Sequence, residues 1–505
     1  MKNKYQELKR RLQEITDLNM AAAMLGWDQS TYMPPAGAPA RGRQLATLGR
    51  VAHEKLIDKS IGCLLDDLEP WAESLPYESD KAALIRLTRH DFDRATKIPP
   101  QLLAEFQQHA AAAYQTWITA RPANDFAAVQ DNLSKTIDYA RQIANCFPGY
   151  DHIADPLIDR ADRGMKAESV RTIFAELRKE TVPIVKAITA QEAVDDSCLK
   201  QFFPKDKQLA FGMIASQKFG YDLKRGRQDM THHPFMVNFS IDDVRITTRV
   251  RENDLNEALF STLHETGHAL YELGISHDLE GTPLAEGTSS GVHESQSRLW
   301  ENMVGRSQPF WNHYYPKLQA IFPEQLNDVP FDTFYRAINK VQPSLIRTDA
   351  DEVTYNLHVM IRFDLELALL EGSLEVKDLP ETWHARYDAD LGERAPSHVD
   401  GVLQDIHWYG GIVGGVFQGY TLGNIMSALF FDHALQAHPA ILAEIEQGKF
   451  DTLHTWLKDN IYRHGSKFTA DELIERVTGG PLTIKPYIQY LRSKFGTLYD
   501  LDNHL

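Results

Sequence analysis

The chain has 505 residues, of which 43% are hydrophobic and 24% charged; these are globular proportions, and the length suffices for a large buried core. Its net charge of −17 is offset by no basic cluster, which argues against nucleic acid or an acidic membrane as a partner. Only three cysteines occur (Cys63, Cys146 and Cys198), as is usual in a reducing compartment. The charged N-terminus lacks the apolar core of a signal peptide. We therefore expect a cytoplasmic protein.

Apolar residues at three- and four-residue spacing predict helices along most of the chain. In chain order the predicted helices cover residues 1–20, 100–121, 167–190, 254–274, 295–304, 351–372 and 440–464. Strand character is confined to residues 236–250, where alternating β-branched side chains predict a small hairpin that turns at Asp242 and Asp243. No repeat and no Gly/Ser linker divides the chain, so the expected fold is mostly α with a minor sheet.

Residues 406–431 contain no Asp, Glu, Lys or Arg and are long enough to cross a bilayer. Glycines interrupt this stretch, however, among them Gly410, Gly411, Gly414, Gly415 and Gly419, together with Gln418 and Asn424. Such an interrupted pattern favours a buried loop and helix over a membrane span.

Residues 264–268 read His-Glu-Thr-Gly-His. On a helix, residues four apart lie on one face, so His264 and His268 can reach one metal ion. Glu265 then lies beside the metal, where it can take a proton from a metal-bound water. Two ordinary surface or core histidines are the alternative, since this short pattern also arises by chance. Gly267 is unusual inside a helix and indicates close packing or close approach of the metal.

A catalytic zinc ion needs a third protein ligand and one open position. Glu294, which directly precedes the next predicted helix and follows soon after His268, is the best candidate. Its neighbour His293 competes for this role, and Glu286 and Glu301 are weaker candidates because no motif surrounds them. A salt-bridged helix residue is the alternative role for Glu294.

Six blocks of sequence, in this order, resemble the signature of the carboxypeptidase Taq family of metallocarboxypeptidases. They are HPF at 233–235, DVRIT at 243–247, HETGH at 264–268, HESQ at 293–296, IRTDAD at 346–351 and GVLQDIHW at 401–408. The resemblance extends over about residues 20–500 and includes WDQ at 27–29. One departure is the run 416–420, which reads VFQGY where the family usually has a proline before the tyrosine.

The resemblance implies a helical zincin fold similar to neurolysin and the angiotensin-converting enzymes. Residues 1–505 would form one metallopeptidase domain, with two lobes flanking a long substrate groove and the site motifs within residues 230–425. It also implies a homodimer and a zinc ion, for which cobalt is a possible substitute at the same ligands.

Release of a C-terminal residue requires recognition of a free carboxylate, which arginine binds in a bidentate manner. Arg347 is the first candidate, and a structural pair with Asp349 or Asp351 is the alternative. Arg245 either lines the groove or forms a scaffold pair with a neighbouring aspartate.

Three further residues are candidates for contacts with a bound peptide. His233 precedes a proline and is therefore extended, so it could donate to a substrate carbonyl or be an ordinary loop histidine. His407 is a candidate for substrate or outer-sphere contact. Tyr420 has the phenol needed to stabilise an oxyanion, although a buried structural tyrosine would have the same sequence.

These observations predict a zinc metallocarboxypeptidase that releases single amino acids from peptides with broad specificity. Its mechanism would be attack by metal-bound water with Glu265 as the base. One alternative is an oligopeptidase or dipeptidyl carboxypeptidase on the same scaffold. Another is a non-catalytic, zinc-bearing, peptide-binding protein.

Overall fold

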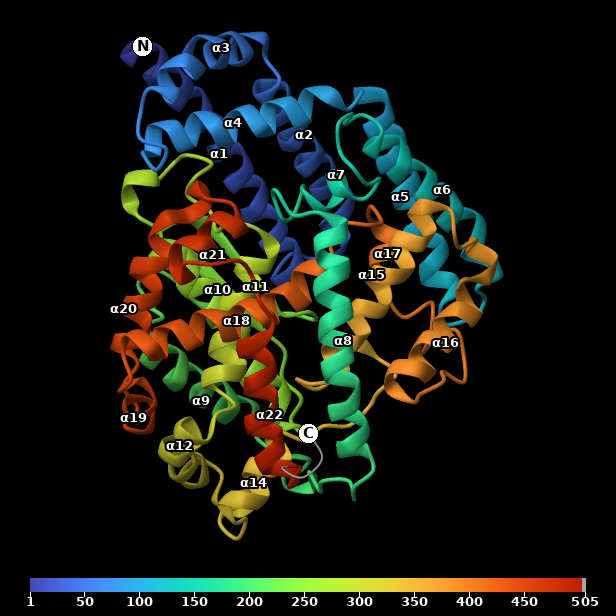
Figure 1. The fold of residues 1–505 in the computed structure, drawn as a ribbon, viewed down its shortest axis with the longest axis vertical. Helices are drawn as coiled ribbons and strands as arrows, with labels where there is room; N and C mark the ends of the chain where they lie inside the picture. Colours follow the sequence, from blue (N-terminus) through green and yellow to red (C-terminus); the bar gives the residue numbers. More distant parts are fainter. Residues whose placement is uncertain (502–505) are drawn as a thin grey trace.

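The computed structural model describes residues 1–501, and helices make up most of it (Figure 1). The mostly α prediction is confirmed. The helices of the first half are α1 (Lys2–Thr31), α2 (Ala38–Leu56), α3 (Lys59–Glu73), α4 (Asp80–Lys97), α5 (Pro100–Ala120), α6 (Ala127–Ala144), α7 (Asp155–Ile158), α8 (Ala167–Thr189) and α9 (Lys205–Phe219). Those that follow the sheet are α10 (Leu255–Gly274), α11 (Ser290–Arg298), α12 (Gln308–Ile321), α13 (Pro323–Leu326), α14 (Phe331–Ile338), α15 (Tyr355–Glu371), α16 (Leu379–Leu391), α17 (His407–Gly410), α18 (Gln418–Ala437), α19 (Ile441–Glu446), α20 (Asp451–Asn460), α21 (Ala470–Thr478) and α22 (Lys485–Tyr499).

Helices far apart in the sequence gather on two sides of the molecule. Figure 1 shows α5, α6, α15, α16 and α17 on one side, and α9, α10, α12, α18 and α20 on the other, with the long helix α8 between them. The N-terminal helices α1 to α4 lie together at one end. They form a second, smaller hydrophobic core together with Ile241 and the segment 275–284, whereas most of the remaining helices share one large core.

The small sheet has three strands in the order β1 (Gln228–Met230), β3 (Asp243–Thr248), β2 (Met236–Ser240). Strands β2 and β3 are antiparallel, with Met236 opposite Ile246, which confirms the predicted hairpin. Strand β1 runs parallel to β3 and was not predicted, because three residues are too few to show an alternating pattern. The sheet packs against α10, which carries the HETGH motif.

Most predicted helices form, but some of the predictions need correction. The helix predicted over residues 1–20 continues to Thr31, and the one predicted over 295–304 begins at Ser290 and becomes a π-helical turn at Leu299. The prediction of one helix over residues 440–464 is wrong, because Gly448 takes a left-handed conformation (φ = 70°) between α19 and α20. Helix α15 begins at Tyr355 rather than at residue 351. There Asp351 accepts hydrogen bonds from the backbone N–H groups of Val353 and Thr354, so its side chain bonds to the loop before the helix.

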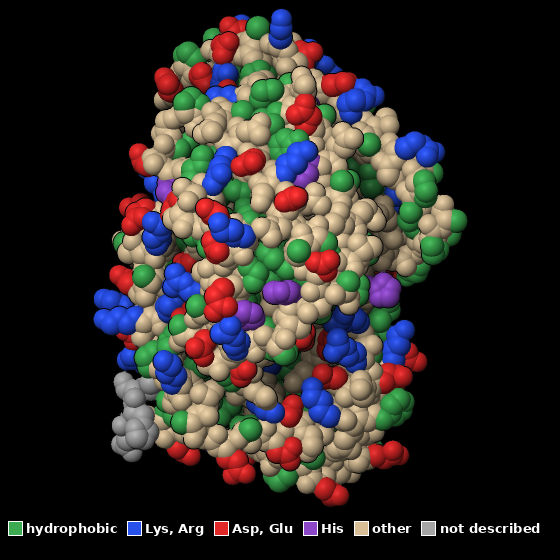
Figure 2. All heavy atoms as spheres, turned by 90° about the vertical axis from the view of Figure 1, so that its right-hand side faces the viewer, with side chains coloured by type: hydrophobic (Ala, Val, Ile, Leu, Met, Phe, Trp, Pro, Cys, Tyr) green, Lys and Arg blue, Asp and Glu red, His purple; other side chains and the backbone are tan. Residues whose placement is uncertain are grey.

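Residues 406–431 form the buried loop and helix that the sequence predicts. They comprise α17, a glycine-containing turn and most of α18, whose side chains are largely buried in the core. Within residues 1–501, none of the helices combines the length and the hydropathy needed to cross a bilayer. One face of the surface carries interspersed acidic and basic side chains and a hollow in its lower half (Figure 2).

Glycines allow the helices around the HETGH motif to approach closely. A Cβ atom at Gly267 of α10 would lie 2.5 Å from the carbonyl oxygen of Gln296 and 2.6 Å from Cα of Ser297 in α11. On the other side of α11, a Cβ atom at Gly423 of α18 would lie 2.6 Å from Cβ of Glu294. Close packing is thus the reason for a glycine at position 267. The absence of a side chain there lets α11 lie close to the part of α10 that carries the two histidines.

The Gly267→Ala variant is expected to lose at least about 2 kcal/mol of unfolding free energy, because the backbone of α11 cannot move aside like a flexible side chain. The matched control is Gly42→Ala in α2, where the glycine is exposed and nothing lies within 4 Å of the added Cβ. That control should gain about 0.5–1 kcal/mol. Calorimetric melting of both variants checks the prediction, which fails if Gly267→Ala melts like the wild type.

Candidate metal centre and substrate cavity

Three side chains from α10 and α11 converge at one point. His264, His268 and Glu294 each contribute one ligand atom, and these atoms lie within 4.8 Å of one another. Oε2 of Glu294 is 3.7 Å from Nε2 of His264 and 3.5 Å from Nε2 of His268. Two imidazoles and a carboxylate are a common ligand set of catalytic zinc. The residues therefore fit a metal ion, and the structure brings together the three ligands predicted from the sequence.

The outer nitrogen of each histidine is held by a further side chain. Nδ1 of His264 is 2.9 Å from Oε2 of Glu301. Nδ1 of His268 is 2.6 Å from Nδ1 of His293, and Nε2 of His293 is 2.8 Å from Oε1 of Glu272. If both histidines donate outward, each Nε2 keeps its lone pair for the metal. His293 therefore lies behind the cluster and is not one of its three ligands.

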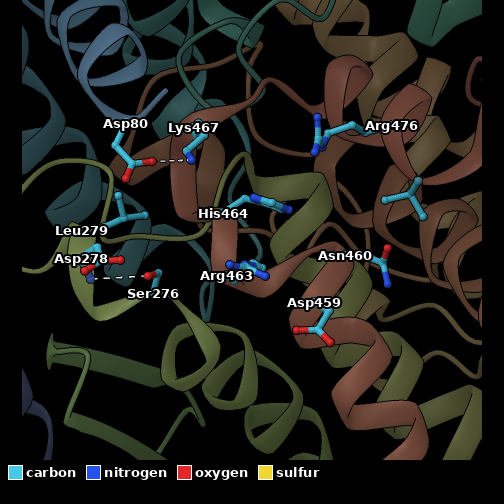
Figure 3. Close-up of a pocket in the computed structure, with 11 residues that line it drawn as sticks. Asp80, Ser276, Asp278, Leu279, Asp459, Asn460, Arg463, His464, Lys467 and Arg476 are labelled. Atoms are coloured by element: carbon cyan, nitrogen blue, oxygen red, sulfur yellow. Dashed lines mark hydrogen bonds and ion pairs between the residues drawn. The ribbon is translucent and has the colours of Figure 1, made fainter. Parts of the chain in front are cut away.

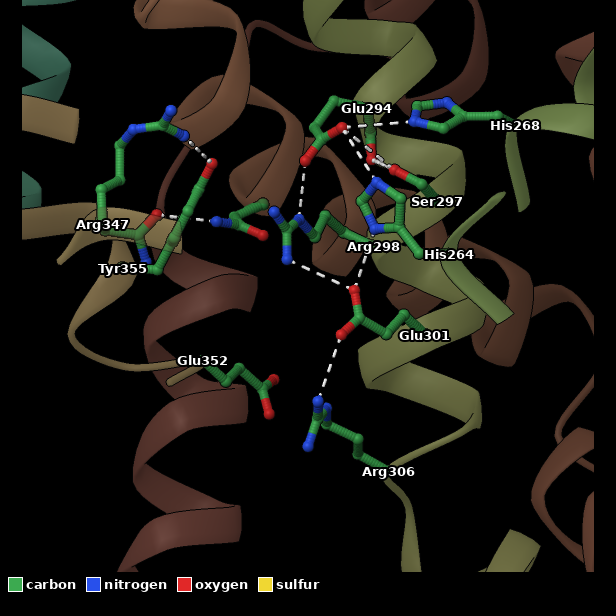
Figure 4. Close-up of polar contacts among 12 residues, drawn as sticks. His264, His268, Glu294, Ser297, Arg298, Glu301, Arg306, Arg347, Glu352 and Tyr355 are labelled. Carbon is green, nitrogen blue, oxygen red and sulfur yellow. Dashed lines mark hydrogen bonds and ion pairs between the residues drawn. The ribbon is translucent and has the colours of Figure 1, made fainter. Parts of the chain in front are cut away.

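Arg298 holds the other oxygen of Glu294 and keeps that side chain ionised. Its Nε donates to Oε1 of Glu294 over 2.7 Å, and its Nη1 donates to Oε2 of Glu301 over 3.3 Å (Figure 4). Burial alone would raise the pKa of Glu294, but Arg298 and the two histidines bring it well below its ordinary value. Glu294 thus presents a single oxygen, Oε2, to the histidine nitrogens.

Glu301 belongs to a π-helical turn, Leu299–Val304, which directly continues α11. A turn of this kind widens the helix and often occurs at functional sites. Here it places Glu301 where it can reach both His264 and Arg298. Glu301, a weaker ligand candidate from the sequence, therefore lies behind His264 and is not one of the three converging side chains.

Glu265 differs from the other acids of the centre because nothing holds its carboxylate. It is only 6% exposed, and within residues 1–501 it makes no side-chain hydrogen bond or ion pair. Burial raises the pKa of Glu265 to about 7. A carboxyl group with such a pKa can take up and release a proton near neutral pH.

The metal cluster opens into a cavity of about 880 Å³. Of the substrate-site residues predicted from the sequence, Arg347, His233, His407 and Tyr420 line this cavity. Arg245 is not among the lining residues. Instead it donates to Asp243 over 2.8 Å and lies 4.5 Å from the centre of the Trp27 ring.

The guanidinium group of Arg347 is bound by Asp405, a residue of the GVLQDIHW block, and by Tyr355. Its Nε donates to Oδ2 of Asp405 over 2.9 Å, and its Nη1 donates to the Tyr355 hydroxyl over 3.2 Å. The other charged partners of Asp405 are Arg362 and His407. In the described part of the chain Nη2 of Arg347 has no protein hydrogen-bond partner. Arg347 therefore pairs with Asp405, and not with Asp349 or Asp351 as the alternative assumed.

Two tyrosines lie beside this arginine in the cavity. The guanidinium carbon of Arg347 is 5.4 Å from the centre of the Tyr420 ring, and Tyr355 and Tyr420 pack edge to face. Burial raises the pKa of Tyr420 well above its ordinary value, so its phenol stays protonated at neutral pH and can donate a hydrogen bond. Tyr355 was missed from the sequence, where no pattern distinguishes it among 19 tyrosines.

The VFQGY run that departs from the family signature is well anchored. Gln418 is fully buried and donates to Asp162 and to the carbonyl of Gly415, each over 2.9 Å. A Cβ atom at residue 419 would collide with the Ser290 side chain, so glycine is needed at this position. Specific contacts therefore hold the turn before Tyr420.

Comparison with known proteins decides the family. The sequence model of the carboxypeptidase Taq (M32) metallopeptidases matches residues 7–495. The chain belongs to this family. It is 38% identical over 505 residues to thermostable carboxypeptidase 1 of Thermus thermophilus, covering 98% of this chain and 99% of that protein. It is 34% identical over 489 residues to carboxypeptidase 1 of Bacillus subtilis, covering 97% of each.

A solved structure agrees with these relatives. The crystal structure of the M32 carboxypeptidase from Deinococcus radiodurans R1 superimposes with a TM-score of 0.96 at 49% identity, covering 99% of this chain and 100% of that one. The resemblance seen in the sequence is thereby confirmed. The protein is a metallocarboxypeptidase, a hydrolase of peptide bonds, and neither alternative is favoured.

This metallocarboxypeptidase has a second polar hollow, of about 400 Å³, at a distance from the motifs. It is lined by residues of the 276–279 turn, the end of α20 and α21, and an ion pair between Asp80 and Lys467 lies at its edge (Figure 3). None of its lining residues belongs to the metal cavity. None of its lining residues belongs to the six motif blocks either.

Proposed function

We propose that this metallocarboxypeptidase uses a zinc ion held by His264, His268 and Glu294 to release single amino acids from the C-terminus of peptides. The observation that carries the proposal is that His264, Glu294, the unpaired Glu265 and Arg347 all line one cavity, and that the ligand atom of His268 lies within 4.8 Å of those of His264 and Glu294. When bound, zinc polarises a scissile carbonyl and lowers the pKa of water. Cobalt could occupy the same ligands.

Glu265 would act as the general base. Its carboxylate has no protein partner to compete for a proton, and its raised pKa suits proton transfer near neutral pH. It would accept a proton from the attacking water and pass it to the nitrogen of the departing amino acid. The buried surroundings of Glu265 would limit access of bulk water to this proton.

Arg347 would bind the terminal carboxylate of the peptide. Asp405 and Tyr355 fix the guanidinium, while Nη2 remains available for a ligand. Fixing one end of the substrate presents the last peptide bond to the catalytic groups. Tyr420 would donate a hydrogen bond to the developing oxyanion. His233 and His407, at the cavity wall, would contact the peptide, and the position of Arg245 supports a scaffold role.

We also propose that the whole chain works as one metallopeptidase unit, with two lobes flanking the cavity, in the cytoplasm and as a homodimer. The large core shared by helices on both sides supports a single unit. Sparse free cysteines support a reducing compartment. The family resemblance supports the homodimer.

The test is to incubate the protein with a short peptide, with and without a chelator, and to identify the products by mass spectrometry. Stepwise loss of single C-terminal residues is expected, abolished by the chelator and restored by zinc or cobalt. Internal fragments or C-terminal dipeptides would contradict the proposed cleavage position. Full activity after complete removal of metal would contradict the proposed centre.

A further inference from the structure

The segment that carries Arg347 is closed into a loop by one partly buried aspartate. Asp351 accepts hydrogen bonds from the backbone N–H of Gln342 over 3.0 Å and from the N–H and hydroxyl of Thr354 over 3.0 and 2.7 Å. We call residues 341–354 the anchor loop. Arg347 lies near the middle of this loop, so its position depends on what holds the two ends.

Both ends of the anchor loop are attached to the C-terminal helix α22. At the first end, the backbone N–H of Val341 donates to the Tyr499 hydroxyl over 2.8 Å. At the second end, the Glu352 carboxylate accepts from Lys494 over 2.6 Å and from the Tyr490 hydroxyl over 2.5 Å. Helix α22 is thus attached to the loop from outside the cavity.

The pair between Lys494 and Glu352 is buried, with the two side chains only 8% and 6% exposed. Removing two charges from water costs several kcal/mol each, and an apolar pair of similar volume often stabilises a fold as well or better. Stability alone is therefore a poor explanation for this pair. Its directional hydrogen bonds suit a role in placing Glu352, and with it the anchor loop.

The same group of side chains also touches the metal side of the site. The Tyr490 hydroxyl lies 3.3 Å from the carbonyl oxygen of Asn302, in the π-helical turn that holds Glu301 behind His264. Figure 4 shows Glu352 on the side of the site that carries Arg347, facing the helix of Glu301. Tyr490 therefore lies between the anchor loop and the π-helical turn of the metal centre. The separation of these two parts would decide which peptide bond is cut.

We infer that Glu352, Lys494 and Tyr490 are positioning residues that set the distance between the metal centre and Arg347, so that a single residue fits between them. The inference rests on the proposed role of Arg347. One residue spans about 3.3–3.6 Å, so the space left for the terminal residue depends on where the anchor loop holds Arg347. A loose anchor loop would therefore weaken the binding of free C-termini before it affected the metal chemistry.

The test compares wild type with the double variant Glu352→Gln/Lys494→Met, which removes the pair without leaving a lone buried charge. Each protein is assayed on one peptide as the free acid and as the C-terminal amide, with metal content measured alongside. For the free acid, KM should rise about tenfold while kcat stays within about twofold. Hydrolysis of the amide should not change, so the acid-to-amide ratio of kcat/KM should fall.

The matched control is Arg492→Met, which removes the exposed ion pair with Glu180 from the same helix and should leave the ratio unchanged. Tyr490→Phe, which deletes one hydroxyl, replaces the double variant if that protein does not fold. A folded, metal-containing variant with the wild-type ratio overturns the inference. If the wild-type enzyme shows no preference for the free acid, the proposed role of Arg347 is itself contradicted. The test therefore distinguishes a failure of that role from a failure of the positioning inference.

Discussion

Glu265→Gln is expected to lower kcat at least about a thousandfold while the protein keeps its bound metal. Glutamine has the size of glutamate but cannot accept the proton of the attacking water. Residues His264, His268 and Glu294 supply the ligand atoms, so the substitution leaves the proposed metal site intact. Single-turnover hydrolysis and metal analysis of the purified variant check both halves of the prediction.

A matched control for this variant is Glu73→Gln in α3. Glu73 is exposed, and within residues 1–501 its side chain makes no hydrogen bond or ion pair. This control should retain activity within about threefold, as is usual for surface changes outside a site. If Glu265→Gln were as active as the control, the general base would have to be another residue. Loss of metal from Glu265→Gln would instead mean that Glu265 helps to hold the ion.

Arg347→Lys is expected to reduce kcat/KM for free-acid peptides about a hundredfold, mainly through KM. Lysine keeps a positive charge beside Asp405, which also retains Arg362 as a partner, so the fold should survive. It lacks the planar fork that binds a carboxylate with two hydrogen bonds. Steady-state kinetics on a free-acid peptide and its amide measure the loss.

Arg245→Lys is the comparison that separates the two arginines. Arg245 pairs with Asp243 and is not part of the cavity wall, so its substitution should change stability more than KM. Equal losses of kcat/KM in both variants would mean that Arg245 reaches the substrate after all. An unchanged KM in Arg347→Lys would remove the proposed carboxylate anchor.

Local sequence patterns were sufficient to predict a feature wherever its residues lie close together in the sequence. The spacing of His264 and His268 depends only on helix geometry, so the two imidazoles could be placed on one face without knowledge of the fold. The hairpin at 236–250 and the buried run at 406–431 were likewise predictable from alternation and from the pattern of glycines. Glu294 was predicted from its place shortly after the HETGH helix, and the HESQ block of the family signature also contains it.

Contacts between distant segments required the tertiary structure. Arg347 pairs with Asp405, a residue far along the chain, and the Tyr355 hydroxyl that also holds it belongs to another helix. Glu301 reaches His264 only because a π-helical turn continues α11. The break at Gly448 overrides an amphipathic pattern that by itself predicts one long helix.

The sequence by itself determined the helical class and the family, and it indicated His264, Glu265 and His268 as candidates for the metal chemistry, because these depend on spacing within one helix and on matched motifs. Only the tertiary structure decided which groups hold those residues in place, and which arginine faces the cavity. The physical reason is that a buried charge is stable only with a partner, and packing chooses that partner from anywhere in the chain.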